Sequence, residues 1–119
     1  MDVIEAYREN TVTTQTQGRL VVLLYDGAIK FLKQAVKEIQ AGQWAQKGEY
    51  INKAIAIINE LNSSLDMESG GEIADNLRQL YNFMTKHLAE ANIRRDNQKI
   101  RDVIACLNDL NEGWKAATA

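Results

Sequence analysis

The segment from Leu20 to Ile29 is apolar on more than one side of a helix, and this limits the possible folds more than any other feature of the sequence. One set of positions has the alternating four- and three-residue spacing of a buried helix seam: Val21, Tyr25, Ala28, Leu32, Ala35 and Ile39. A second stripe, roughly 80–100° around the helix, consists of Leu20, Leu23, Leu24, Gly27 and Phe31. A small bundle needs one apolar face per helix to close its core. The second face must therefore be covered by another helix, by a partner, or by a mobile part of the same chain.

Four long amphipathic segments, separated by short breaks, make up most of the chain. They span about residues 17–40, 44–65, 70–92 and 96–116, and as helices they would each be about 30 Å long. The sequence contains no proline, which favours long uninterrupted helices. Matched lengths and short connections favour antiparallel neighbours. We therefore predict an all-α fold, an antiparallel up-down-up-down four-helix bundle that forms one domain over residues 1–119.

The predicted helices also carry start signals and core stripes. Thr16 and Asp96 have side chains suited to cap the first and last helices, and Ser69 and Glu72 have the spacing of a capping box before the third. The last three helices should complete the core with Ile51, Ala54, Ile58, Leu61, Leu65, Ile73, Leu77, Leu80, Met84, Leu88, Ala91, Ile100, Val103, Leu107, Leu110 and Trp114.

Residues 1–15 differ from the rest of the chain. Val3, Ile4 and Tyr7 are apolar at helical spacing, so one or two helical turns could dock through them. The residues from Asn10 to Gln15 are polar and β-branched, with weak helix propensity. This segment is consistent with a short apolar arm on a flexible tether, and the alternative is a frayed terminus.

Composition excludes several functional classes. The net charge of −2 gives no electrostatic case for nucleic acid or an anionic membrane. The single cysteine, Cys106, cannot form an internal disulfide and favours a reducing compartment. No apolar run approaches the 18 residues of a membrane span, and the acidic N-terminus lacks the basic region of a signal peptide. We therefore expect a cytoplasmic protein without membrane insertion.

The sequence offers no set of residues for catalysis or metal binding. A di-metal bundle needs Glu-x-x-His pairs on two helices, whereas the only histidine is His87 and the residue three before it is Met84. Cys106 has no nearby base in the sequence, so a structural cysteine is favoured over a catalytic thiol. His87 is expected at the core edge, hydrogen-bonded to a neighbour. We predict no enzymatic activity, no metal and no cofactor.

Aromatic and aliphatic residues beside the seams predict a groove. Tyr25, Tyr81 and Trp114 fall on stripe positions and are assigned to the core. The second segment gains a wider apolar face from Tyr50, Ile55 and Ile57. Contiguous exposed apolar surface marks an interaction site. The predicted binding groove therefore consists of Leu20, Leu23, Leu24, Gly27, Phe31, Tyr50, Ile55 and Ile57.

An ordered series of short motifs along the chain is similar to a known protein family. The series contains Ala6-Tyr7, Leu24-Tyr25-Asp26-Gly27-Ala28, the segment from Lys53 to Leu61, Ser64-Leu65-Asp66, Gly70-Gly71-Glu72-Ile73-Ala74, Leu80-Tyr81, Ala91-Asn92 and Trp114. In this order and at these spacings, the chain resembles the flagellin-specific export chaperones, the FliS family, from about Tyr7 to Trp114. One departure is Gln17, because members of the family often carry a proline just before the first long helix.

The resemblance implies a four-helix bundle in the bacterial cytoplasm that binds the C-terminal segment of newly made flagellin, its client. It implies that the client forms helices in a hydrophobic groove, is kept from polymerising, and is delivered to the flagellar export gate without nucleotide. It also implies that the N-terminal element covers part of the groove when no client is bound, with Tyr7 as the matching aromatic residue. The runner-up is a homo-oligomeric helical scaffold or adaptor that uses the second face for self-association, and a homodimer of the free protein is left open.

Overall fold

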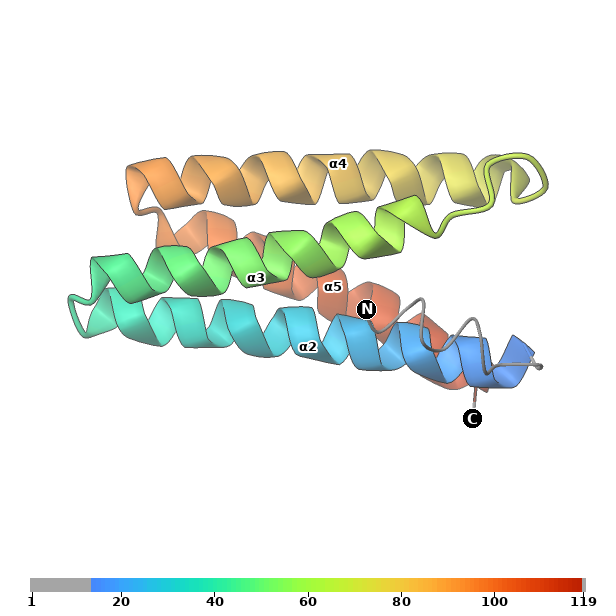
Figure 1. The fold of residues 1–119 in the computed structure, drawn as a ribbon, viewed down its shortest axis with the longest axis horizontal. Helices are drawn as coiled ribbons and strands as arrows, with labels where there is room; N and C mark the ends of the chain where they lie inside the picture. The colour runs from blue at the N-terminus through green and yellow to red at the C-terminus, as the bar shows by residue number, and fades with distance from the viewer. Residues whose placement is uncertain (1–13, 119) are drawn as a thin grey trace.

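The computed structural model describes residues 14–118 of the chain. Over this range it contains four α-helices: α2 Thr14–Gln40, α3 Trp44–Ser63, α4 Gly71–Arg94 and α5 Asn97–Thr118 (Figure 1). The largest departure from the predicted bounds is at the start of α2, which begins at Thr14 rather than at residue 17. The predicted arm residues Val3, Ile4 and Tyr7 lie outside the described residues.

Successive helices run in opposite directions along a common long axis (Figure 1). α2 packs against α3 and α5, and α4 packs against the same two helices. Each helix therefore has two antiparallel neighbours around a shared core. The predicted all-α, up-down-up-down bundle is confirmed.

The core consists of side chains spaced three and four residues apart on each helix. A fully buried aliphatic or aromatic side chain contributes roughly 1.5–3 kcal/mol relative to an exposed one, so this set provides the main stabilisation of the fold. Its largest buried members, each at most 2% exposed, are Tyr25, Leu32, Ile51, Ile58, Tyr81, Met84, Leu88, Ile100, Val103 and Leu107.

One predicted core residue is exposed. Ile73 was assigned to the stripe of the third helix, but 73% of its surface is accessible. It lies in the first turn of α4, where Ala74 occupies the inward position, three residues before buried Leu77. Ile73 is four residues before Leu77 and Ala74 is three residues before it, and both spacings fit a helical stripe. The spacing alone therefore does not show which of the two residues faces the core.

The predicted helix starts have different outcomes. Asp96 caps α5, because its Oδ1 accepts hydrogen bonds from the backbone N–H groups of Gln98 at 3.0 Å and Lys99 at 3.4 Å. The predicted capping box before α4 is wrong: the N-cap is Gly70, and the Ser69 hydroxyl donates to the Asp66 carboxylate in the preceding loop. Thr16 is not a cap, since it lies inside α2.

A buried lysine joins α3 to α4 at one end of the bundle. Lys47, in the first turn of α3, is only 5% exposed. Its Nζ donates to the backbone carbonyl of Asn92 at 2.8 Å and to Asn92 Oδ1 at 2.6 Å. Burial lowers the pKa of this ammonium group, and the nearby guanidinium of Arg95 lowers it further. The carbonyl end of a helix attracts a cation, which explains why a lysine is tolerated in this position.

Two tyrosine hydroxyls form a hydrogen bond inside the core. Tyr25 of α2 and Tyr81 of α4 lie diagonally across the bundle, and their oxygens are 2.6 Å apart. Burial is the main reason why the pKa of each phenol is raised. For Tyr81, the neighbouring Tyr25 raises the pKa further. Because each hydroxyl supplies the other with a partner, neither is left unsatisfied in the apolar core.

We predict that single Tyr25→Phe and Tyr81→Phe variants each lower the free energy of unfolding by about 1–2 kcal/mol, because each leaves one buried hydroxyl without its partner. The double variant should lose less than the sum of the two single losses. Urea denaturation of the four proteins measures this coupling, and strictly additive losses would contradict it.

Since the folded-state pKa values of Tyr25 and Tyr81 are raised, wild-type stability should fall as the pH rises above about 10, the pKa of an unfolded tyrosine. The double variant should show a smaller fall.

Candidate binding surface

The second apolar stripe of α2 lies on the side of the helix that faces α3. Gly27 and Phe31 contact residues of α3, and Leu24 is half-buried beside them. Leu20, at the N-terminal end of the stripe, is 6% exposed, whereas Leu23 is 57% exposed. The stripe is therefore not a free face, because Gly27 and Phe31 pack against α3 and Leu20 is buried.

α3 contributes an aromatic and an aliphatic side chain to the same surface. The rings of Phe31 and Tyr50 stack with centroids 6.2 Å apart and an interplanar angle of 27°. The Nζ of Lys53 lies 5.5 Å from the Phe31 centroid and 5.6 Å from the Tyr50 centroid, within range of a cation–π interaction. This cluster forms one end of a half-buried apolar surface.

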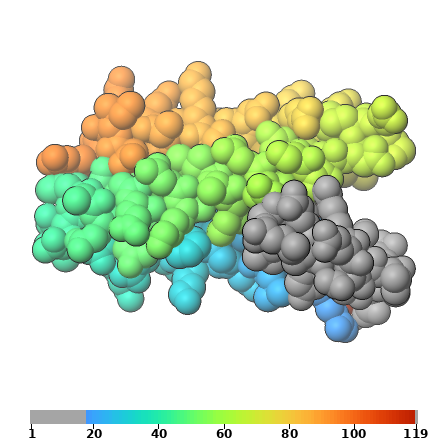
Figure 2. Space-filling view, viewed as in Figure 1, coloured from blue at the N-terminus to red at the C-terminus, as the bar shows by residue number. Residues whose placement is uncertain are grey.

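Gly27 faces Ile57 of α3 at the middle of this surface. A Cβ atom at position 27 would stand 3.4 Å from Cδ1 of Ile57, which is a van der Waals contact. We call this surface the α2–α3 face, and it consists of Leu20, Leu23, Leu24, Gly27, Phe31, Tyr50 and Ile57. Figure 2 shows α3 beside the middle part of α2 along one face of the molecule.

Ile55 does not share the α2–α3 face with the other predicted groove residues. At 100° per residue, it lies about 160° around α3 from Ile57. Because Ile57 faces α2, Ile55 is on the flank towards α4, where it packs half-buried against the core. The sequence pattern showed that both residues flank the seam but did not show that they flank it on opposite sides.

α4 carries exposed apolar side chains that lie outside its predicted core stripe. Phe83 is 51% exposed and Ile93 is 83% exposed. The Phe83 ring stacks on the His87 ring, with centroids 4.8 Å apart. Phe83 directly precedes buried Met84, which rotates it by about 100° away from the core. This rotation was the signal available in the sequence.

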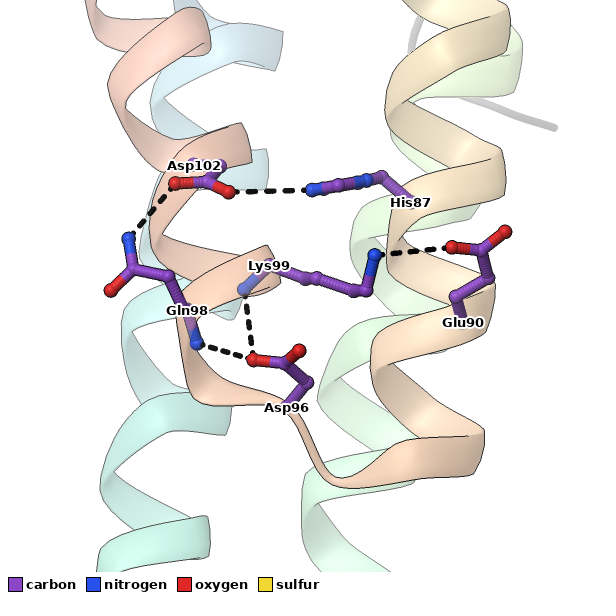
Figure 3. A network of polar contacts seen from close by, with 6 residues as sticks. All are labelled: His87, Glu90, Asp96, Gln98, Lys99 and Asp102. Carbon is purple, nitrogen blue, oxygen red and sulfur yellow. Dashed lines mark hydrogen bonds and ion pairs between the residues drawn. The ribbon is translucent and has the colours of Figure 1, made fainter.

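Polar contacts link α4 to α5 on the same side (Figure 3). His87 Nε2 lies 3.4 Å from Asp102 Oδ2, which confirms that His87 is a core-edge histidine bonded to a neighbour. Lys99 Nζ donates to Glu90 Oε2 at 3.2 Å. The hydrogen bonds from Gln98 and His87 lower the pKa of the Asp102 carboxyl, and the hydrogen bond from Lys99 lowers that of Glu90. These contacts join α4 to α5.

The described residues show no arrangement suited to covalent or metal chemistry. Cys106 is half-buried, and burial raises the pKa of its thiol, which disfavours the reactive thiolate. Within residues 14–118, no group of three or more His, Cys, Asp or Glu side chains is placed to hold a metal ion. None of the described helices has the length and apolarity needed to cross a bilayer. The α2–α3 face offers apolar contact to a partner.

Comparisons with known proteins agree with this fold. A solved structure described as the crystal structure of a flagellar chaperone from bacteria superposes with a TM-score of 0.81. The superposition covers 95% of this chain and 92% of that chain at 19% sequence identity. At this level of identity, the likeness supports the fold alone.

Sequence relatives extend the comparison to the family. The chain is 42% identical over 108 residues to the flagellar secretion chaperone FliS of Salmonella typhimurium, covering 90% of this chain and 80% of that protein. It is 38% identical over 115 residues to the flagellar secretion chaperone FliS of Vibrio cholerae, covering 93% and 85%. The sequence model of the flagellar protein FliS matches residues 1–119. The chain therefore belongs to the FliS family, a family of flagellar secretion chaperones and not of enzymes.

Proposed function

We propose that this protein is a bacterial cytoplasmic export chaperone that binds the C-terminal segment of flagellin on the α2–α3 face. The client would be kept from polymerising and would be passed to the flagellar export gate in the bound form. The observation that carries the proposal is the second apolar stripe of α2, which continues onto α3 through Gly27–Ile57 and Phe31–Tyr50 and ends in exposed Leu23. Membership of a secretion chaperone family supports a flagellar protein as the partner.

The dimensions and chemistry of the α2–α3 face fit a helical client. α3 has 20 residues and is therefore about 30 Å long, which accommodates several turns of a bound helix. Its apolar residues recur along the two helices at helical spacing, which matches the anchor pattern of helix-in-groove recognition. Lys53 stands over the aromatic end of the face and places a cation there. An amphipathic client helix with an acidic residue near one end would satisfy both features.

Residues 1–13 supply the second part of the proposal. Val3, Ile4 and Tyr7 would occupy part of the α2–α3 face in the free protein and would leave it when the client binds. Because the tether is short, the effective local concentration of this arm would be in the millimolar range. A weak docking contact would then be enough to keep the surface covered most of the time.

The first test is binding to flagellin with and without its C-terminal segment. We expect a one-to-one complex with full-length flagellin and a negative heat-capacity change of binding, because apolar surface is buried as the segment folds. Calorimetry and light scattering measure the two quantities. Undiminished binding to flagellin without the segment would contradict the proposal, and self-association that ignores flagellin would favour a homo-oligomeric scaffold or a homodimer.

A second test separates binding from folding on the α2–α3 face. We predict that Leu23→Asp weakens flagellin binding about 30-fold, a typical effect of losing an interface anchor worth about 2 kcal/mol. The melting temperature should change little, because Leu23 is already largely exposed.

Ile73→Asp is the matched control, since it adds the same charge to an exposed position on α4 and should leave binding unchanged. Leu20→Asp is unsuitable because Leu20 is buried. A drop in melting temperature for Leu23→Asp without a separate loss of binding would assign Leu23 to a structural role.

A third test addresses the arm. If Tyr7 only covers the α2–α3 face, Tyr7→Ala should tighten flagellin binding, because the client then displaces a weaker competitor. Amide hydrogen exchange should show faster exchange of residues 1–13 in the client-bound protein than in the free protein. Equal exchange in both states, with unchanged affinity of Tyr7→Ala, would show that the arm is only a frayed terminus. Weaker binding by Tyr7→Ala would show that Tyr7 contacts the client.

A further inference from the structure

A hollow lies between α2 and α5. It is an open groove of about 570 Å³, and four lysines line it: Lys30, Lys33 and Lys37 from α2 and Lys115 from α5. Asp26, Gln34 and Asn108 complete its polar lining. The chain as a whole has 16 acidic and 14 basic residues, so this groove is locally basic in an acidic protein. We call it the lysine groove.

The one carboxylate in the groove is already engaged by α5. Asp26 Oδ1 accepts a hydrogen bond from Nδ2 of buried Asn111 at 2.8 Å and lies 3.6 Å from Lys115 Nζ. These contacts pair Asp26 with the lysine of α5 and hold it beside that helix. Asp26 therefore does little to neutralise the three lysines of α2.

The three lysines of α2 have no carboxylate partner within the part of the chain that the structure describes. None of the ion pairs found among residues 18–118 involves Lys30, Lys33 or Lys37. They recur three and four residues apart, on one side of α2, where like charges repel and slightly destabilise a helix. An external anion would relieve this repulsion.

The spacing of the three lysines indicates how the negative charges of a bound partner would be arranged. Lys30 and Lys37 are seven residues apart, so the row is about 10 Å long. A partner helix lying along the groove, with carboxylates three and four residues apart, would present the same spacing. A flat membrane surface would not follow a hollow between two helices.

We propose that the lysine groove binds an acidic helical segment of a partner protein. The groove lies between α2 and α5, whereas Gly27 and Phe31 of the α2–α3 face contact α3, so the two surfaces use different neighbours of α2. The proposal does not depend on which client the α2–α3 face binds. Its test therefore uses a synthetic probe and no flagellin.

The probe is an alanine-based peptide of about 18 residues, long enough to form a helix in water, with glutamates three and four residues apart. A matched peptide carries glutamine at the same positions. Titration into the full-length, ¹⁵N-labelled protein should shift amide signals of residues 30–37 and 108–115 with the acidic peptide only. Higher salt should weaken the binding, because exposed ion pairs are screened. Equal binding of the glutamine peptide would overturn the proposal.

Charge-matched variants locate the site. Lys33→Gln combined with Lys37→Gln should weaken binding of the acidic peptide about tenfold, the effect of losing two exposed ion pairs. Lys86→Gln combined with Arg94→Gln removes the same charge from exposed positions on α4 and should leave binding unchanged. Both variants should melt at the wild-type temperature. Equal losses in the two variants would show nonspecific attraction and overturn the proposal. Lysine-dependent binding to phosphatidylglycerol vesicles or to an oligonucleotide, without binding to the peptide, would overturn it as well.

Discussion

The packing of α2 against α3 is the interaction on which the rest of the structure depends. α2 carries two apolar stripes, and a helix at the edge of a four-helix bundle can direct only one of them into the core. The second stripe is turned towards α3, where Gly27 faces Ile57 and where Phe31 stacks on Tyr50. This orientation directs the remaining, charged flank of α2 towards α5, so that Asp26 meets Asn111 and Lys115. The positions of both candidate surfaces follow from this single orientation.

Buried polar contacts restrict how the helices can slide past one another. The hydrogen bond between Tyr25 and Tyr81 joins α2 to α4 across the core. Lys47 joins the start of α3 to the end of α4, and Asn111 joins α5 to α2. Apolar seams alone tolerate shifts by a helical turn with modest cost, whereas a shifted polar group would be left unsatisfied in an apolar interior. These three contacts favour one alignment of the helices.

Periodicity predicted the helices and most of the core because both depend on local sequence and on a regular repeat. The Asp96 cap was predictable for the same reason, since its partners are two and three residues away. Sequence spacing could not predict contacts between distant residues. It did not show that Ile55 and Ile57 flank opposite sides of α3, that Lys47 would be buried against Asn92, or that Lys115 would join three lysines of α2. Ser69 had the right spacing for a capping box, but its hydroxyl donates a hydrogen bond to the Asp66 carboxylate instead.

The partial burial of the α2–α3 face is compatible with the proposed binding role and with a stable free protein. A large, fully exposed apolar patch would promote aggregation, and a fully buried one would offer nothing to a client. Here Leu24, Gly27, Phe31, Tyr50 and Ile57 are half-buried by packing within the bundle, and only Leu23 is largely exposed. A client helix would therefore gain contact with a row of shallow apolar positions and one protruding anchor. Binding of this kind would derive its affinity from the length and shape of the contact rather than from a single deep pocket, as the proposed transfer of a client to an export gate requires.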